Sequence, residues 1–197
     1  MTTSTLLNEQ SRLREILDAY CIRRGEFVLA AGGRSSYFFQ GKFATLSPEG
    51  ARLTGELVFE RLRGQGIEAV GGKALGADPI ATAVALTSGL HGEPLPAFIV
   101  RPQRKDHGIE DLIAESYAPD GKPLISPGRR VAIVDDVATS GRSCMDAVDA
   151  VKAAGCEIAK IVVLVDRQQG AAEFFAKQGY PFEALFVADA SGNLSNA

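Results

Sequence analysis

Two adjacent carboxylates follow an apolar run in the second half of the chain. Asp135 and Asp136 come directly after Val131-Ala-Ile-Val134, and a turn of small and hydroxyl-bearing residues follows them. Carboxylates accept hydrogen bonds from sugar hydroxyls or help to hold a hydrated cation, whereas hydroxyls and backbone N–H groups at a helix N-terminus bind phosphate. Together they indicate a site for a sugar phosphate. Besides the two acids, its candidate residues are Val137, Ala138, Thr139, Ser140, Gly141, Arg142 and Ser143.

In a plainer interpretation, Asp136 only ends a strand and Ser143 only helps to start a helix. Two acids in succession after an apolar run favour the ligand site, at what we expect to be a solvent-facing strand end. The stretch is not the lysine-containing phosphate loop of nucleoside triphosphatases, because no lysine follows Gly141.

A second group of charged residues lies in a long polar segment, residues 101–128. It contains Arg101, Lys105 and His107 and is rich in Pro, Gly and Asp. Connections of this length without regular structure are commonly functional or mobile. The plainer interpretation is a solvated loop.

Alternating apolar patterns predict the elements that position these residues. A helix is expected over 6–22 and a hairpin over 26–39, and Ser47 with Pro48 predicts a helix start and a helix to Arg63. A glycine-rich loop is expected over 71–78, and residues 189–197 are expected to fray. The further strands are expected at 67–70, 97–100, 129–134, 158–165 and 182–187, and the further helices at 79–88, 143–153 and 171–178. This order predicts one α/β domain, residues 1–197, with an open parallel sheet between helices.

The composition argues against several classes of partner. Lys and Arg number 21 against 24 Asp and Glu, a net charge of −3, and no block of like charges suggests a nucleic-acid surface. No apolar run approaches the roughly 20 residues of a membrane span, and no signal peptide is recognisable. Cys21, Cys144 and Cys156 are scattered, which suits a reducing compartment. We expect a cytoplasmic protein that binds neither nucleic acid nor membrane.

Residues 131–143 resemble the phosphoribosyl pyrophosphate signature of the type I phosphoribosyltransferases. The resemblance implies that Asp135 and Asp136 hold the ribose 2- and 3-hydroxyls, while the turn wraps the 5-phosphate. It also implies that family's fold, an open parallel sheet flanked by helices. A small N-terminal helix and hood would occupy about residues 1–45, and a mobile catalytic loop about residues 101–128.

Four further stretches resemble orotate phosphoribosyltransferases. Lys-Asp-His-Gly at 105–108 resembles their catalytic loop, which comes from the neighbouring subunit of a dimer and closes over pyrophosphate. The resemblance assigns Lys105 and His107 to catalysis and Arg101 to substrate binding. The other three stretches, at 25–39, 70–79 and 164–168, assign Phe38 and Phe39 to the orotate ring, Lys73 to pyrophosphate and Arg167 to orotate.

The resemblance implies transfer of ribose 5-phosphate from phosphoribosyl pyrophosphate to orotate, giving orotidine 5′-phosphate and pyrophosphate in pyrimidine biosynthesis. It implies Mg²⁺ bound mainly through phosphoribosyl pyrophosphate, and a homodimer whose active sites are shared across the interface. The chain departs from the family at Ala30, where many members carry lysine, at Pro102, where a second loop lysine often stands, and at Leu75, about where some members place another lysine. Two alternatives therefore stay open: a phosphoribosyltransferase for another, purine base, and a regulatory protein that senses phosphoribosyl pyrophosphate.

Overall fold

The apolar runs form a central sheet whose inner strands are parallel. The structure, a computed structural model, describes residues 3–28, 34–102, 112–118 and 121–197. Within these residues the sheet has seven strands in the order β5-β4-β3-β6-β7-β8-β9. The edge strands β5 and β9 are antiparallel to their neighbours. The strands are β3 (Ala69–Lys73), β4 (Ala97–Val100), β5 (Ile113–Glu115), β6 (Arg130–Ala138), β7 (Glu157–Asp166), β8 (Phe182–Ala188) and β9 (Leu194–Asn196).

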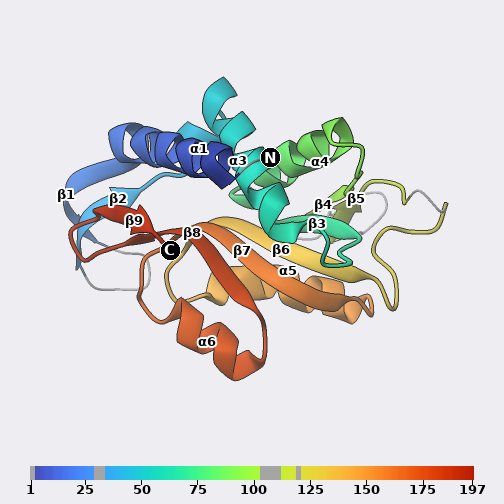
Figure 1. Ribbon diagram of the computed structural model, residues 1–197. Coiled ribbons are helices and arrows are strands. Elements are labelled where there is room, and N and C mark those ends of the chain that lie inside the picture. Colours follow the sequence, from blue (N-terminus) through green and yellow to red (C-terminus); the bar gives the residue numbers. More distant parts are fainter. Residues whose placement is uncertain (1–2, 29–33, 103–111, 119–120) are drawn as a thin grey trace.

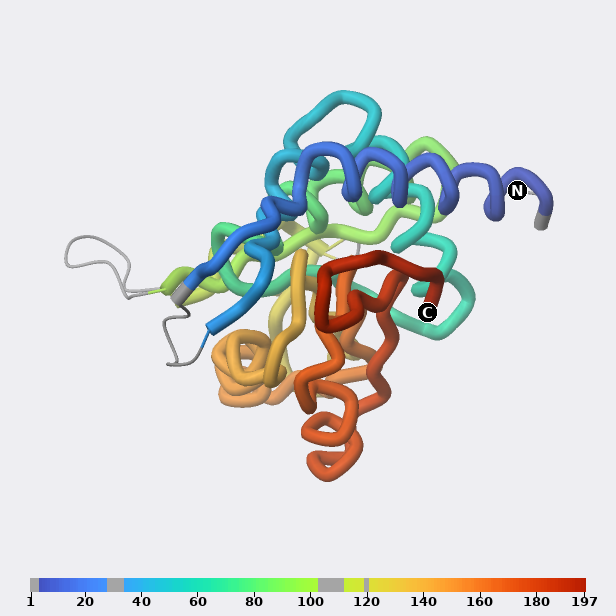
Figure 2. Tube along the Cα trace, turned by 90° about the vertical axis from the view of Figure 1, so that its left-hand side faces the viewer, coloured from blue at the N-terminus to red at the C-terminus, as the bar shows by residue number. Residues whose placement is uncertain are grey.

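Helices cover both faces of this sheet (Figure 1). One face carries α1 (Thr3–Ile16), α3 (Pro48–Leu62) and α4 (Ala77–Leu90), and the other carries α5 (Arg142–Ala153) and α6 (Ala171–Gln178). Seen from the side, α1 (blue) lies above the sheet and α5 and α6 (orange) lie below it (Figure 2). The expected α/β fold with helices on both faces is therefore confirmed.

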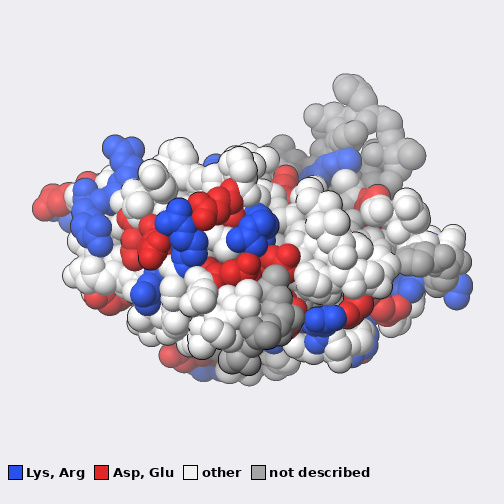
Figure 3. Space-filling model, turned by 45° about the horizontal axis from the view of Figure 1, so that its top comes forward, with Lys and Arg blue, Asp and Glu red and all other residues white. Residues whose placement is uncertain are grey.

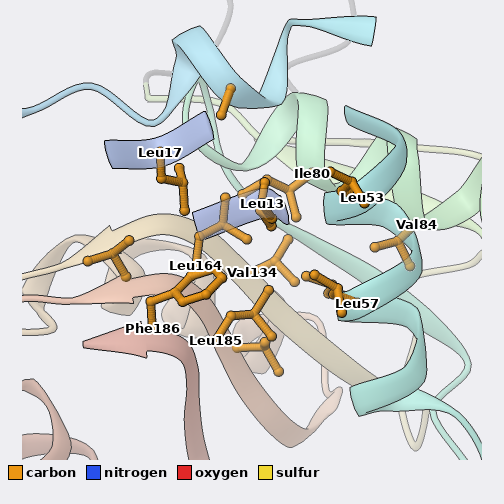
Figure 4. Close-up of a cluster of buried hydrophobic side chains, with 14 of the residues drawn as sticks. Leu13, Leu17, Leu53, Leu57, Ile80, Val84, Val134, Leu164, Leu185 and Phe186 are labelled. Atoms are coloured by element: carbon orange, nitrogen blue, oxygen red, sulfur yellow. The ribbon is translucent and has the colours of Figure 1, made fainter. Parts of the chain in front are cut away.

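Two hydrophobic cores hold the layers together. Figure 4 shows the first, in which side chains of α1, α3 and α4 meet those of the sheet; it includes Leu13, Leu53, Ile80, Val134 and Leu164. The second lies between the opposite face and the helices α5 and α6. Because both faces are covered, β6 and β7 are apolar almost throughout, as strands of a parallel sheet usually are.

The N-terminal part forms a small hood beside the sheet. α1 continues into one turn of π-helix, η1 (Leu17–Cys21), and then into the antiparallel hairpin of β1 (Ile22–Val28) and β2 (Arg34–Phe39). A short helix, α2 (Lys42–Thr45), leads to α3, which begins as expected: Ser47 Oγ accepts a hydrogen bond from Gly50 N (3.1 Å) and Pro48 is the first helical residue.

Several expected boundaries were wrong in informative ways. β3 runs through Lys73, so the loop expected from Gly71 begins later, and β6 extends through both carboxylates to Ala138. Residues 189–197 do not fray, because β9 pairs with β8. The polar segment 101–128 contains β5 and buried side chains of Ala118, Leu124 and Ile125, although residues 103–111 and 119–120 lie outside the described part. Among the described residues, no helix has the length and apolarity needed to cross a bilayer.

Candidate active site

The acidic pair lies at the carboxyl end of β6, where open α/β sheets bind their ligands. The expectation of a solvent-facing strand end was wrong. Asp135 is only 8% exposed and Asp136 is half-buried. β6 pairs with β7 as far as Ala138, so the acids are part of the sheet and their neighbours close over them. Because both acids belong to a strand of the sheet, the pairing of β6 with β7 holds their backbone in place.

Two glycines bring other segments onto this pair. A Cβ atom at Gly76, in the loop after β3, would lie 2.5 Å from Asp135 Oδ1 and 2.9 Å from Asp136 Oδ1. A Cβ atom at Gly41, between the hood and α2, would lie 2.7 Å from Asp136 Oδ2. Neither position accepts a side chain without displacing a carboxylate. Two segments far apart in the sequence therefore converge on the acids of β6.

The protein gives the two carboxylates few partners. Asp135 Oδ1 accepts a hydrogen bond from Asp136 N (2.9 Å), and Asp135 Oδ2 accepts long contacts from Ser143 Oγ (3.4 Å) and Cys144 Sγ (3.7 Å). Burial, and then the charge of Asp136, raise the pKa of Asp135. Burial also raises the pKa of Asp136, opposed by a hydrogen bond with Asp135 and by the charge of Lys42. Such a pair gains from a ligand that supplies hydroxyl donors or positive charge.

The turn after the acids packs closely against α6 and leads into α5. Gly141 has a left-handed φ of +78° and provides no capping side chain for α5, so that helix begins without one. A Cβ atom there would lie 2.8 Å from Phe175 Cζ, which again requires glycine. Thr139, Ser140 and Ser143 keep accessible side chains beside this helix start. A turn that combines hydroxyls with a helix N-terminus has the chemistry to bind a phosphate.

Two cations lie at the carboxyl ends of β3 and β4, the strands that precede β6 in the sheet order: Lys73 is the last residue of β3. Lys73 contacts the Asp146 carboxylate of α5, and the peptide bond Ala74–Leu75 that follows is cis. Arg101 directly follows β4 and is partly buried. The carboxyl ends of β3, β4 and β6 thus place cations and acids along one edge. Lys105 and His107 lie outside the described residues.

Arg167 joins the hood to this edge. Its backbone N donates to Ala138 O (2.9 Å), so it directly neighbours the turn after the acids. Its Nε donates to Tyr37 Oη (2.9 Å) and its Nη2 to Ser35 Oγ (2.8 Å), and the guanidinium lies 4.3 Å from the centre of the Tyr37 ring. The sequence alone would make Arg167 a surface residue, whereas it is 8% exposed.

The two hood phenylalanines differ in access. The Phe38 side chain is 40% exposed and lies 5.7 Å from the ring of Phe27, whereas Phe39 is 7% exposed and belongs to the first core. Alternation along β2 causes this, because successive side chains of a strand point to opposite faces. Phe38 can meet a planar ligand. The expectation that Phe39 also does so is not supported, since its ring packs inside.

Sequence reasoning missed part of this arrangement. Gly41 and Gly76 are constrained only by distant side chains, which no local pattern reveals. Tyr37 and Ser35 contact Arg167 from positions 130 and 132 residues away in the sequence. Their signal in the sequence was no stronger than that of other hydroxyl-bearing residues in strands.

The fold and the site define a phosphoribosyltransferase. Residues 77–176, which include the acidic pair and its turn, match the family model described as "Phosphoribosyl transferase domain". A curated relative from Rhodopseudomonas palustris (strain TIE-1), named orotate phosphoribosyltransferase, is 43% identical over 91% of this chain and 94% of its own. One from Synechocystis sp., with the same name, is 39% identical over 95% and 90%.

Solved structures agree with these relatives. A crystal structure of the Mycobacterium tuberculosis H37Rv orotate phosphoribosyltransferase in complex with 5-phospho-α-D-ribosyl 1-diphosphate is 31% identical, has a TM-score of 0.70 and covers 89% of this chain and 94% of its own. The chain belongs to the orotate phosphoribosyltransferase family.

Proposed function

We propose that this chain transfers ribose 5-phosphate from phosphoribosyl pyrophosphate to orotate, releasing orotidine 5′-phosphate and pyrophosphate. The observation that carries the proposal is the buried acidic pair of β6, closed in by Gly41 and Gly76 and followed by a helix start without a capping side chain. Family membership at about 40% identity supports the same reaction. Neither observation favours the purine or the regulatory alternative.

Asp135 and Asp136 accept hydrogen bonds from the ribose 2- and 3-hydroxyls, and the turn from Val137 to Ser143 holds the 5-phosphate. Burial raises the pKa of both acids. A sugar whose ring becomes positively charged as pyrophosphate departs stabilises their ionised form, and the stabilisation is mutual. This preference for the transition state is the kind that accelerates a reaction. No side chain acts as a nucleophile.

The donor set at this edge fits a magnesium ion held mainly by the substrate. Mg²⁺ takes oxygen ligands and commonly binds through one or two carboxylates together with substrate phosphates. Asp135 and Asp136 are such carboxylates, and among the described residues no three acids, histidines or cysteines gather to form a complete metal site. When bound, the ion would neutralise charge on pyrophosphate. Lys73, Arg101 and the loop residues Lys105 and His107 bind the same group from the protein side.

We assign Arg167 and, from the outer face of β2, Phe38 to the base. The guanidinium has five N–H groups, and two hydrogen bonds to the hood fix its plane. Other N–H groups of this cation can meet the carboxylate of orotate, an anionic and planar pyrimidine. The exposed Phe38 ring offers a face for the base, and Phe39 supports β2 from inside. A neutral purine would gain nothing from this charge.

We also propose that the chain acts as a cytoplasmic homodimer in which each loop closes over the neighbouring site. An apolar groove of about 760 Å³ runs between α3 and α4 and includes the exposed Leu46, Leu86 and Leu90. Leu75 and Lys42 line the same groove, and they adjoin Gly76 and Gly41 of the active site. A second copy seated there would bring its own loop to this site. We also propose that residues 1–197 form a single domain.

The described residues on the face carrying α1 and α3 mix both signs of charge (Figure 3). There, positive and negative groups alternate (Figure 3), and Arg12 pairs with Glu49 (2.8 Å) while Arg52 pairs with Glu9 (2.8 Å). Such pairs neutralise one another across the helices. A small-molecule substrate suits this charge distribution better than nucleic acid does.

The proposal is tested by base selectivity. The chain is incubated with phosphoribosyl pyrophosphate, Mg²⁺ and an equimolar mixture of orotate, uracil, adenine and hypoxanthine, and the nucleotides are separated. We expect orotidine 5′-phosphate to dominate. A purine nucleotide as the main product would support the first alternative, and no nucleotide despite measurable binding of phosphoribosyl pyrophosphate would support the regulatory one.

A further inference from the structure

The turn formed by residues 189–193 contacts the hood at three places. Ser36 Oγ donates to Ala190 O (2.8 Å), and Arg24 Nη2 donates to Asn193 Oδ1 (3.2 Å). The third contact joins Gly192 to the ring of Tyr37. Directly after the turn, β9 pairs with β8, so the turn is fixed to the central sheet. In Figure 1 this part (red) lies beside β2.

Asp189 gives the 189–193 turn a defined shape. Its Oδ1 accepts hydrogen bonds from Ser191 N (2.8 Å) and Asn193 N (2.9 Å), and its Oδ2 accepts one from Asn193 Nδ2 (2.8 Å). A further backbone bond joins Asp189 N to Asn193 O (3.1 Å). The bonds from Asn193 lower the pKa of Asp189, so the carboxylate that organises the turn is charged at neutral pH.

Gly192 is the part of the turn that no other residue can replace without movement. Its φ of +81° is left-handed, and a Cβ atom would lie 2.7 Å from Tyr37 Cγ and 3.0 Å from Cδ1 and Cδ2. Tyr37 is 2% exposed and has little room to yield. The backbone at Gly192 therefore sets where the Tyr37 ring lies.

Tyr37 in turn holds Arg167. Its hydroxyl accepts from Arg167 Nε and its ring lies under the guanidinium. The hairpin that carries Tyr37 has only two strands, and such a hairpin is marginally stable without packing partners. Its position depends on the surfaces against which it packs. The 189–193 turn is one of these surfaces, and it touches three residues of the hairpin.

We infer that the 189–193 turn is a positioning element of the base pocket, with Gly192 as its positioning residue. By fixing the Tyr37 ring, the turn fixes the guanidinium of Arg167 and so sets the affinity for an anionic base. This inference rests on the proposed function, because it assigns Arg167 to orotate. It concerns affinity for the base, since the contacts of the 189–193 turn described above reach the hood, whereas the acidic pair and its turn lie on β6 and α5.

The test compares Gly192→Ala with Gly179→Ala. Gly179 has a similar left-handed φ of +78°, but no atom lies within 4 Å of a Cβ atom there, so its variant carries backbone strain without the clash. We expect Gly192→Ala to raise the KM for orotate about tenfold or more, the loss expected when a charge-assisted hydrogen bond is misplaced. The KM for phosphoribosyl pyrophosphate should stay within about twofold. Gly179→Ala should change neither.

Asn193→Ala provides a milder second variant if Gly192→Ala does not fold. It removes the hydrogen bond from Arg24 and the bond from Asn193 Nδ2 to Asp189, while the backbone N of residue 193 can still donate to Asp189. We expect a smaller rise in the same KM. Equal changes in both KM values, or an unchanged KM for orotate in every folded variant, would overturn the inference. If the unaltered chain makes no nucleotide from orotate, the proposed function fails instead.

Discussion

Replacing Asp135 with asparagine should stabilise the protein while lowering its activity. The buried carboxylate has a raised pKa, caused first by burial and then by the charge of Asp136, so its charge is unfavourable in the folded state. Asparagine keeps an oxygen that can accept from Asp136 N, and its amide can face Ser143 Oγ. At about pH 8 we expect the free energy of unfolding to rise by about 1–3 kcal/mol.

The gain should depend on pH in a defined direction. Because the folded-state pKa is raised, the unaltered protein loses stability as pH rises from the ordinary aspartate value of 3.8 through that raised pKa. The difference between variant and unaltered protein should therefore vanish at about pH 4 and be complete above the raised pKa. Urea unfolding at both ends of this range measures it.

The same variant should lose kcat/KM by roughly ten- to a hundredfold, the loss expected from one charged hydrogen bond to a ribose hydroxyl. Asp149→Asn is the matched control, because Asp149 is exposed on α5 and its neutralisation should change stability by no more than about 0.5 kcal/mol. A loss of stability at pH 8 would refute the electrostatic argument. Unchanged activity would refute the assignment of Asp135 to ribose.

Three further substitutions test the rest of the site. Gly76→Ala should abolish binding of phosphoribosyl pyrophosphate while the chain still folds, because its Cβ atom would displace Asp135; normal binding by calorimetry would show that the acids are not held there. Arg167→Ala should raise the KM for orotate far more than that for phosphoribosyl pyrophosphate, and equal effects would make Arg167 structural. Lys105→Ala should lower kcat by about 10²–10³. Mixed with Asp135→Asn/Asp136→Asn subunits, it should recover about a quarter of full activity if the loop acts across a dimer, and no recovery despite subunit exchange would place the loop over its own site.

The sequence predicted those features that depend on neighbouring residues. The periodicity of α3, α5, α6 and β7 was sufficient, because each buries one face or both in a regular pattern. The acidic pair could be located at a strand end for the same reason. The burial of the pair could not be predicted, because Gly41 and Gly76 reach it from segments about 95 and 60 residues away. Close approach of two backbone segments leaves no pattern in the sequence.

Neighbouring residues also could not predict that residues 189–197 have a defined structure. Their polar composition predicts fraying, yet Asp189 closes a turn and β9 gains a partner strand in β8. The pairing of Arg167 with Tyr37 and Ser35 likewise exists only in the folded chain. In both cases polar groups that look solvated join distant segments: Ser36 and Arg24 reach the 189–193 turn. Ser35 and Tyr37 reach Arg167 in the same way.

The most direct measurement of the central claim is the product balance with orotate as the sole acceptor. Purified protein is given phosphoribosyl pyrophosphate, Mg²⁺ and orotate, and orotidine 5′-phosphate and pyrophosphate are both quantified, beside the Asp135→Asn/Asp136→Asn variant. The claim predicts the two products in equal amounts from the unaltered chain, and almost none from a variant whose fold is intact. No orotidine 5′-phosphate from the unaltered chain, or equal activity in the variant, would contradict it.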